Sequence, residues 1–243
     1  MRMALRQYLD RQAFFPDVIG IFINPFYFAR KGLAFHIKAM SAEIGGVVLD
    51  VGCGTKPYAH MFSSTRYVGL EIDTPENRKG KKADYFYDGE HFPFENGFFD
   101  SVVANQVFEH VFNPDEFLNE IHRVLKQDGK FLISVPFLWD EHEQPHDFAR
   151  YSSFGLRHLL EKHGFKVIRS EKSMNDIRVI FQSINMYLFK KLAVRNKFLF
   201  AFSILFLMAP FNVLGEVLSW ILPKNDDLYL DNIILAQKIK KGS

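Results

Sequence analysis

Short apolar runs alternate with amphipathic stretches along most of this 243-residue chain, and this alternation limits the possible folds more than any other feature. The apolar runs are rich in Val, Ile, Leu and aromatic residues, as strands buried on both faces are. They cover residues 47–51, 66–71, 83–87, 100–105, 130–135, 166–171 and 230–237. Because strands that alternate with helices favour a parallel sheet covered by helices, we expect a doubly wound α/β fold.

The amphipathic stretches predict helices over residues 25–43, 114–126 and 153–163. Asn24 is a suitable N-cap for the first helix, with Pro25 at its first helical position. Gly129 and Gly164 stand where the later helices should stop.

The charge of the chain is nearly balanced, with 30 Lys and Arg residues against 28 Asp and Glu residues. We see no basic stripe and expect no nucleic-acid partner.

The single cysteine, Cys53, cannot close an intrachain disulfide. The first residues carry charges throughout and lack the apolar stretch of a signal peptide. We therefore expect a cytoplasmic protein.

The first predicted strand ends in Asp50-Val51-Gly52-Cys53-Gly54. Glycines in a turn at the carboxyl edge of a sheet let a ligand approach the main chain. A Gly-rich turn without a ligand is the alternative. Glu71, at the end of the next strand, argues for a ligand because its spacing from Asp50 suits an acid that accepts both hydroxyls of a ribose.

The residues after this turn favour an adenosyl ligand without phosphates. A dinucleotide site has a third glycine where this chain has Pro57, which offers no N–H. A P-loop lysine is followed by Ser or Thr, whereas Lys56 precedes the proline. S-adenosylmethionine would present hydrogen-bond donors and a positive charge to the acidic positions Asp50, Glu71 and Asp88.

Four motifs occur in order within residues 25–170, in the runs VVLDVGCGTKPY, YVGLEID and YDGEHFPFENGFFDSVVANQVFEHV. Together they resemble the class I, seven-stranded S-adenosylmethionine-dependent methyltransferases of type 11. That group includes ubiquinone, menaquinone and bacterial polysaccharide-cluster enzymes. The resemblance implies a mostly parallel seven-stranded sheet with an antiparallel last strand, and an α-helical apolar insertion before that strand.

The resemblance also implies which residues contact S-adenosylmethionine. Gly52 and Gly54 would lie against its amino acid portion, and Glu71 would hold its ribose. Lys56 stands where this family usually has a further glycine. Other expected contacts around these positions are Asp50, Cys53 and Ile72.

Two further contacts with the cofactor are implied at the ends of later strands. Asp88, with the main chain of Gly89, would face the adenine amine. Asn105 and Gln106 would lie near the methionine end.

Methyl transfer is an in-line displacement at an activated carbon, so the enzyme mainly aligns the reactants and excludes water. A base is needed where the acceptor is a weak nucleophile such as a hydroxyl. Residues 136–151, after the fifth strand, concentrate polar side chains, and we expect them to form the acceptor wall. The candidate catalytic residues are His146, His142 and Asp147. The alternative is that His146 and Asp147 only brace this loop through Arg150.

The sequence His142-Glu143-Gln144-Pro145-His146 matches the zinc protease signature residue for residue. That site needs both histidines one turn apart on a continuous helix, where Pro145 would remove a hydrogen bond. We therefore expect no metal.

Residues 198–215 are eighteen uncharged residues, a length that only just suffices to span a bilayer. Pro210, Asn212 and Glu216 favour a helix, a break at Pro210 and a second short helix. A basic cluster of the kind attracted to anionic lipid precedes this stretch, at Lys190, Lys191, Arg195 and Lys197. The open alternatives are a buried cap, a lid over the acceptor, a homodimer contact, peripheral contact with the inner face of the membrane, and a true membrane span.

We expect three regions, a helical cap at 1–45, a cofactor-binding core at 46–174 and 229–239, and an apolar helical insertion at 175–228.

The expected function is O-methylation of a small-molecule, glycan or lipid-linked sugar acceptor. The alternatives are a quinone-precursor or lipid methyltransferase and a non-catalytic adenosyl-binding scaffold. The polar loop favours a sugar over a quinone, and the apolar stretch favours an acceptor attached to a lipid.

Overall fold

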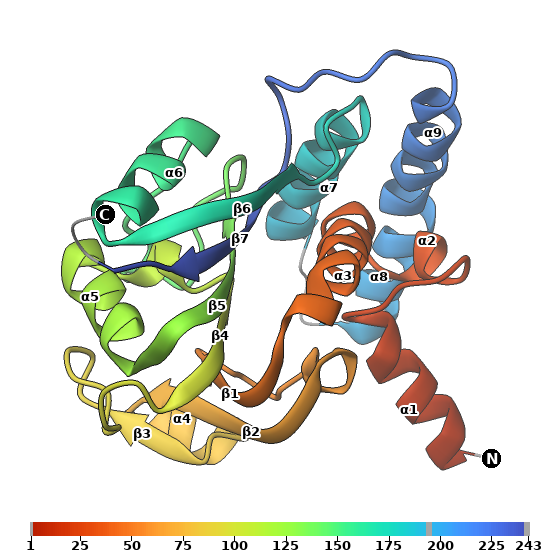
Figure 1. Ribbon diagram of the computed structural model, residues 1–243. Helices are drawn as coiled ribbons and strands as arrows, with labels where there is room; N and C mark the ends of the chain where they lie inside the picture. The colour runs from red at the N-terminus through yellow and green to blue at the C-terminus, as the bar shows by residue number, and fades with distance from the viewer. Residues whose placement is uncertain (1, 193–195, 241–243) are drawn as a thin grey trace. The chain divides into compact units, whose positions relative to one another are not determined.

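The computed structural model describes residues 2–192 and 196–240. Its central feature is a seven-stranded sheet in the order β3-β2-β1-β4-β5-β7-β6 (Figure 1). Strands β3, β2, β1, β4 and β5 pair in parallel, and the end formed by β5, β7 and β6 is antiparallel. The strands are β1 Gly45–Val51, β2 Ser63–Ile72, β3 Tyr85–Tyr87, β4 Phe99–Asn105, β5 Leu125–Pro136, β6 Phe165–Lys172 and β7 Asp231–Lys238. The predicted fold class is confirmed.

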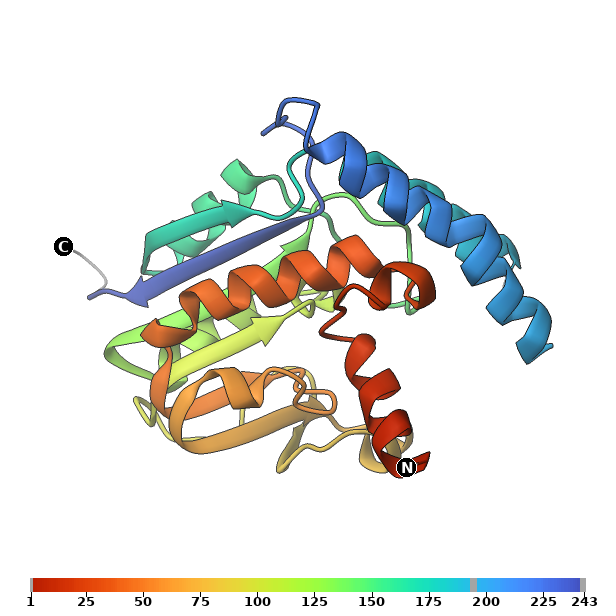
Figure 2. The ribbon, with the colours of Figure 1, turned by 90° about the vertical axis from the view of Figure 1, so that its right-hand side faces the viewer.

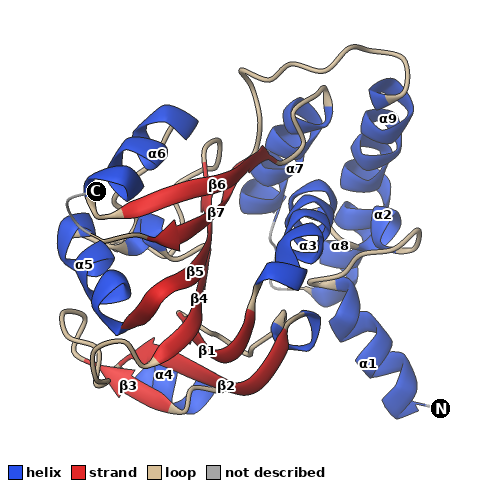
Figure 3. Ribbon diagram, viewed as in Figure 1, coloured by secondary structure: helices blue, strands red, loops and turns tan. Residues whose placement is uncertain are grey.

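Helices connect these strands, and Figure 3 shows α5 and α6 on the same face of the sheet. The α-helices are α1 Arg2–Gln12, α2 Gly20–Ile23, α3 Tyr27–Met40, α4 Pro75–Gly80, α5 Pro114–Val124, α6 Ser153–Lys162, α7 Arg178–Leu192, α8 Lys197–Ser203 and α9 Ala209–Ser219. Short 3-10 turns are η1 Ser41–Glu43, η2 Ala59–Met61 and η3 Phe108–His110, and η4 Ile204–Met208 is a π-helix.

The described chain divides into two compact units. One contains residues 36–137, 141–171 and 232–243, and the other contains residues 1–35, 138–140 and 172–231. The first unit holds most of the sheet, and we call it the sheet unit. The second is mainly helical, and we call it the helical unit. The three regions expected from the sequence stay a prediction.

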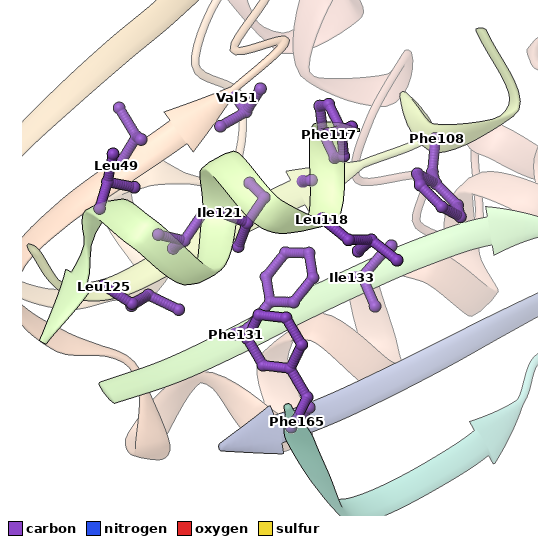
Figure 4. Close-up of a cluster of buried hydrophobic side chains, with 14 of the residues drawn as sticks. Leu49, Val51, Phe108, Phe117, Leu118, Ile121, Leu125, Phe131, Ile133 and Phe165 are labelled. Carbon is purple, nitrogen blue, oxygen red and sulfur yellow. The ribbon is translucent and has the colours of Figure 1, made fainter. Parts of the chain in front are cut away.

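The core of the sheet unit shows why α5 forms where it does. Pro114 lies in its first turn with two acids beside it, which suits a helix N-terminus. Its apolar residues recur at helical spacing and are buried against the sheet (Figure 4). The buried residues of α5 are Phe117, Leu118, Ile121 and Val124.

Two predicted helix boundaries were wrong. Helix α3 begins at Tyr27 rather than at Pro25, because the Asn24 side chain accepts a hydrogen bond from the Phe26 N–H at 2.8 Å and closes a turn before the helix. Gly129 lies inside β5 and does not stop a helix, since α5 already ends at Val124. Gly164 does follow a helix end, with φ of 80°.

The apolar stretch of the helical unit is one continuous helical rod rather than two helices with a break. Its α8, η4 and α9 segments follow one another directly (Figure 2). Pro210 lies in the first turn of α9, and the wider π-helical turn before it accommodates the missing N–H. Residues Phe198–Ser219 form 22 helical residues, long and apolar enough to cross a membrane by length and composition.

One side of this rod is packed within the helical unit. A Cβ at Gly215 would lie 2.7 Å from Phe28 Cζ, so this position in α9 needs glycine for close packing. Asn212 is buried, and its amide donates hydrogen bonds to the carbonyls of Ile21 and Asn24. Only 28% of the apolar window is buried in this way.

Candidate cofactor and acceptor site

The turn after β1 contains two glycines with different surroundings. Both have positive φ, 65° at Gly52 and 54° at Gly54. A Cβ at Gly52 would lie 2.3 Å from Cγ2 of Val107, so packing requires this glycine. A Cβ at Gly54 would meet nothing within 4 Å. The main chain at Gly54 therefore borders open space that a ligand can fill.

Glu71 lies beside this open space at the end of β2. Its Oε1 accepts a hydrogen bond from the Gly54 N–H at 2.6 Å, and the residue is only 7% exposed. Burial raises the pKa of this carboxyl, while the bond from Gly54 acts in the opposite direction. A carboxylate has about four acceptor positions, so one backbone bond leaves capacity for ribose hydroxyls.

Asp50 is a second buried acid, at the end of β1. Burial raises its pKa to about 7, although Tyr67 donates a hydrogen bond to Oδ2 at 2.7 Å. The adjacent Cys53 is also buried, and burial raises the pKa of its thiol to about 12. This pKa disfavours a thiolate, so Cys53 is unsuited to act as a nucleophile, and its expected contact with the cofactor stays a prediction.

Lys56 has a left-handed backbone with φ of 57°, a conformation that glycine adopts easily. Its Nζ forms an ion pair with the Asp84 carboxylate, which also accepts a hydrogen bond from the Gly69 N–H at 2.7 Å. A lysine thus adopts a backbone conformation typical of glycine, and its side chain is tied to the residue that precedes β3.

The residues expected near adenine lie after β3 and at the end of β2. Asp88 is exposed, and its Oδ1 accepts hydrogen bonds from the N–H groups of Glu90 and His91, both at 2.8 Å. These backbone bonds lower the pKa of Asp88. Gly89 has φ of 96°, and a Cβ there would meet nothing within 4 Å. Ile72 is 43% exposed, which leaves an apolar side chain available to a ring.

The residues expected near the methionine end follow β4. Asn105 Oδ1 accepts a hydrogen bond from the Ser134 hydroxyl at 3.3 Å. Gln106 has φ of 56°, and its N–H donates to the Ser134 carbonyl at 2.9 Å. Both residues are half-buried and are fixed to the neighbouring strand β5.

Residues 137–152, between β5 and α6, form no helix, and we call them the acceptor loop. Asp147 braces this loop from inside, with a side chain only 3% exposed. Its carboxylate accepts two hydrogen bonds from the Arg150 guanidinium, at 2.6 and 2.7 Å, and one from the His142 N–H at 2.9 Å. The bonds from Arg150 lower the pKa of Asp147 to about 2. Asp147 is therefore a bracing residue, as in the alternative given above.

The two histidines of the loop differ in their surroundings. His142 is half-buried, with Nδ1 3.2 Å from Asp147 Oδ2. His146 has an exposed side chain, and its carbonyl oxygen lies 2.7 Å from Nδ1 of His110. The charge of Glu143, between them, acts in the direction that raises the pKa of Glu71, with burial as the main cause.

Sequence reasoning missed several residues of this site. Tyr67 begins the run YVGLEID but was given no role there, and Asp84 lies outside the quoted runs; strand pairing brings them to Asp50 and Lys56. Glu109 was not named as a site residue, although it is fully buried beside the acceptor loop. The N–H groups of Phe148 and Ala149 donate to its carbonyl at 2.9 and 3.2 Å.

Comparison with known proteins agrees with this geometry. Residues 49–133 match the family model of a methyltransferase domain. An uncharacterized protein of Methanocaldococcus jannaschii is 34% identical over 127 residues, which are 50% of this chain and 55% of that protein. A probable S-adenosylmethionine-dependent methyltransferase of Mycolicibacterium smegmatis is 29% identical over 161 residues, 61% of this chain and 62% of that protein. The chain thus spans little more than half the length of these curated relatives.

Solved structures share the fold at low sequence identity. The [4+2]-cyclase SpnF has a TM-score of 0.56 and 19% identity, with 87% of this chain and 81% of that chain covered. Phosphoethanolamine N-methyltransferase 2 of Haemonchus contortus, in complex with S-adenosyl-L-methionine, has a TM-score of 0.53 and 21% identity, with 90% and 55% covered.

The matched segment and the sheet order point to the same class. Residues 49–133 match a methyltransferase domain, and the seven-stranded sheet has the Rossmann-like order of class I S-adenosylmethionine-dependent methyltransferases. The cofactor of that class is S-adenosylmethionine.

Proposed function

We propose that this chain is an S-adenosylmethionine-dependent methyltransferase that methylates an oxygen of a sugar or similar small hydroxylated acceptor. The observation that carries the cofactor half of this proposal is the pairing of Glu71 with the main chain of Gly54 beside open space. The acid supplies acceptors for ribose hydroxyls, and the positive φ of Gly54 lets the amino acid portion approach the backbone.

The residues of the sheet edge fit the other parts of the cofactor. The open space at Gly89 and the exposed side chain of Ile72 suit the adenine ring. The buried carboxyl of Asp50 suits the positively charged end of the cofactor, because an opposite charge nearby favours its ionised form. The bound cofactor supplies an activated methyl group, and the chain's own residues align it and exclude water.

Calorimetric titration with S-adenosylhomocysteine tests the cofactor site. We expect Glu71→Ala to weaken binding by about 1 to 3 kcal/mol, since ribose hydroxyls lose their acceptor. The matched control is Glu161→Ala, at an exposed position of α6. Equal affinity of Glu71→Ala and wild type would remove the proposed site.

The acceptor loop supports an oxygen nucleophile. It presents polar groups at the carboxyl edge of β5, and His142 and His146 are its candidate general bases because histidine titrates near neutral pH. A base at this position would take the proton that the acceptor hydroxyl loses when its oxygen forms the new bond to carbon. A quinone-precursor or lipid acceptor is the second candidate, and the exposed apolar rod favours it.

Labelled cofactor separates these candidates. Purified protein would be incubated with methyl-labelled S-adenosylmethionine and with fractionated sugar, lipid-linked sugar and quinone-precursor extracts. Label in a methyl ether of a sugar supports the proposal, and label on a ring carbon supports the second candidate. Binding of the cofactor without transfer to any fraction would favour a non-catalytic adenosyl-binding scaffold.

We propose that the apolar rod contacts the inner face of a membrane, so that the protein acts on a lipid-linked acceptor. Large apolar side chains stay exposed along it, including Phe198 at 88%, Phe202 at 56% and Phe206 at 57%. Trp220, just after the rod, is 83% exposed, and Trp is favoured at membrane interfaces. Lys191 before the rod is also exposed, whereas Arg195 lies outside the described residues.

Vesicle flotation tests this contact. We expect wild type to float with phosphatidylcholine vesicles that contain phosphatidylglycerol, and the double variant Phe202→Glu and Phe206→Glu to stay at the bottom. Phe154→Glu, at an 81% exposed position of α6, is the matched control and should float like wild type. Equal flotation of the double variant would remove the proposal, and a double variant that is monomeric where wild type is dimeric would assign the rod to a homodimer instead.

A further inference from the structure

Glu109, His110 and His142 form a cluster of which the proposed methyl transfer uses only His142, as one of its two candidate general bases. Glu109 and His110 lie in η3 after β4, and His142 lies in the acceptor loop after β5. One ligand atom from each residue lies within 4.8 Å of the other two. Because β4 and β5 are parallel neighbours, their carboxyl ends bring these loops together.

Both histidine rings are held through the same nitrogen. His110 Nδ1 lies 2.7 Å from the His146 carbonyl oxygen, so Nδ1 carries the proton and Nε2 carries the lone pair. His142 Nδ1 lies 3.2 Å from Asp147 Oδ2 and 3.5 Å from Nη2 of Arg150, so this nitrogen is already engaged. Nε2 is therefore the nitrogen with which each ring would bind a metal. Metal-binding histidines typically have this second contact to a carbonyl or carboxylate.

The distances inside the cluster suit a shared ion. His110 Nε2 lies 3.8 Å from Glu109 Oε1 and 4.0 Å from Glu143 Oε2, which is too long for hydrogen bonds. Two ligands bound about 2.1 Å from one tetrahedral ion lie about 3.4 Å apart, so small movements would complete the site. The His110 and His142 rings are already adjacent, with centroids 4.8 Å apart.

The buried position of Glu109 supports the same conclusion. Its exposed fraction is 0%, and a carboxylate in such a place is favoured by a neighbouring cation. Two backbone hydrogen bonds from Phe148 and Ala149 hold the acceptor loop to Glu109, so the ligands from the two loops are fixed to one another.

We propose that Glu109, His110 and His142 bind a divalent transition-metal ion. Two imidazoles and one carboxylate favour an ion of the zinc or iron type over Mg²⁺ or Ca²⁺. Three protein ligands leave a position for an oxygen of water or of an acceptor. That last role, orientation of the acceptor hydroxyl, rests on the proposed function, whereas metal binding does not.

Titration of the metal-free full chain with ZnCl₂, in the absence of S-adenosylmethionine, tests the site. We expect one ion per chain, and at least a tenfold loss of affinity in His142→Ala and in Glu109→Gln. The matched control is His158→Ala, an exposed histidine of α6 in the same unit, which should bind zinc like wild type. Circular dichroism would establish that each variant is folded.

Substitution with Co²⁺ provides a second readout that does not depend on affinity. A bound ion with two nitrogen ligands should give visible absorption bands that His110→Ala removes and His158→Ala retains. Zinc binding of equal strength in wild type and in His142→Ala would overturn the proposal, as would no binding to wild type. Because Glu71→Ala should leave zinc binding intact, failure of the cofactor site and failure of the metal site are distinguishable.

Discussion

The cofactor edge and the acceptor loop of the sheet unit use buried carboxyl groups in opposite ways. At the cofactor edge, burial raises the pKa of Asp50 to about 7 and also raises that of Glu71. In the acceptor loop, the guanidinium of Arg150 lowers the pKa of Asp147 to about 2. The neutral groups of Tyr67 and Gly54 donate hydrogen bonds to Asp50 and Glu71, whereas the charged guanidinium of Arg150 donates to Asp147.

This difference in pKa separates Asp50 and Glu71, which can still bind a ligand, from Asp147, which holds the acceptor loop together. A buried acid with a raised pKa lowers the stability of the free protein at neutral pH. A hydrogen-bond donor or a positive charge on a ligand stabilises its ionised form. An acid already bonded to arginine stabilises its own segment and has little left for a ligand. Removing the charge of Asp50 and removing that of Asp147 should therefore change stability at neutral pH in opposite directions.

The largest effect is expected within the cofactor edge, at Gly52. Alanine there would need a positive φ and would place its Cβ against Val107, so Gly52→Ala should lower the free energy of unfolding by about 4 kcal/mol. Urea unfolding measures this loss. Adding Val107→Ala should recover part of it, and a double variant no more stable than Gly52→Ala would show that the contact is not the cause.

A smaller loss is expected in the acceptor loop. Asp147→Asn removes the charge that Arg150 meets and should lower the free energy of unfolding by about 2 kcal/mol. The control is Asp73→Asn, whose partner Arg78 is 57% exposed, and which should change stability little. Urea unfolding measures the free energy of unfolding of both variants. Equal losses in the two variants would mean that Asp147 does not brace the loop.

The stability contributed by Asp50 should depend on pH with the opposite sign to that contributed by Asp147. A carboxyl whose pKa is raised by folding stabilises the folded state below about pH 4, and this contribution is lost as pH rises through about 7. Between pH 5 and 7 the free energy of unfolding should fall by about 2 kcal/mol through this group.

Asp50→Asn should reduce this slope and be more stable than wild type at pH 8, because it buries no charge and still accepts from Tyr67. Thermal unfolding at both pH values measures the difference. If Asp50→Asn and Asp147→Asn were both destabilised at pH 8, the contrast between the two regions would fail.

The smallest effect on stability is expected at Gly54. A Cβ there meets nothing, so Gly54→Ala should cost only about 1 kcal/mol, from its positive φ. The same Cβ would enter the space assigned to the cofactor, and affinity for S-adenosylhomocysteine should fall about tenfold, or about 1.4 kcal/mol. Calorimetry measures it, and unchanged affinity would show that the cofactor does not approach Gly54.

Most of the sheet was predictable because its strands are short apolar runs between recognisable helices. All seven predicted runs overlap a strand, from Gly45–Val51 to Asp231–Lys238. Predicted boundaries were wrong where a local signal competed with packing. Gly129 was expected to stop a helix, but strand pairing places it inside β5. Pro210 predicted a break, but a π-helical turn let the rod continue.

The candidate site was predictable only where its residues follow a strand in a motif. Glu71 and Gly54 could be named because their spacing from Asp50 is local information, and the structure brings them within hydrogen-bond distance. The partners of Asp50 and Lys56 carry no such pattern.

The amino-acid sequence alone determined the fold class and the cofactor class, because periodicity and strand-end motifs act through neighbours along the chain. Tertiary structure decided which side chains meet across loops. The pattern from His142 to His146 predicted no metal, since a zinc protease site needs both histidines on one helix. Folding instead placed His142 beside Glu109 and His110, more than thirty residues earlier in the chain, because parallel strands bring their distant ends to one edge.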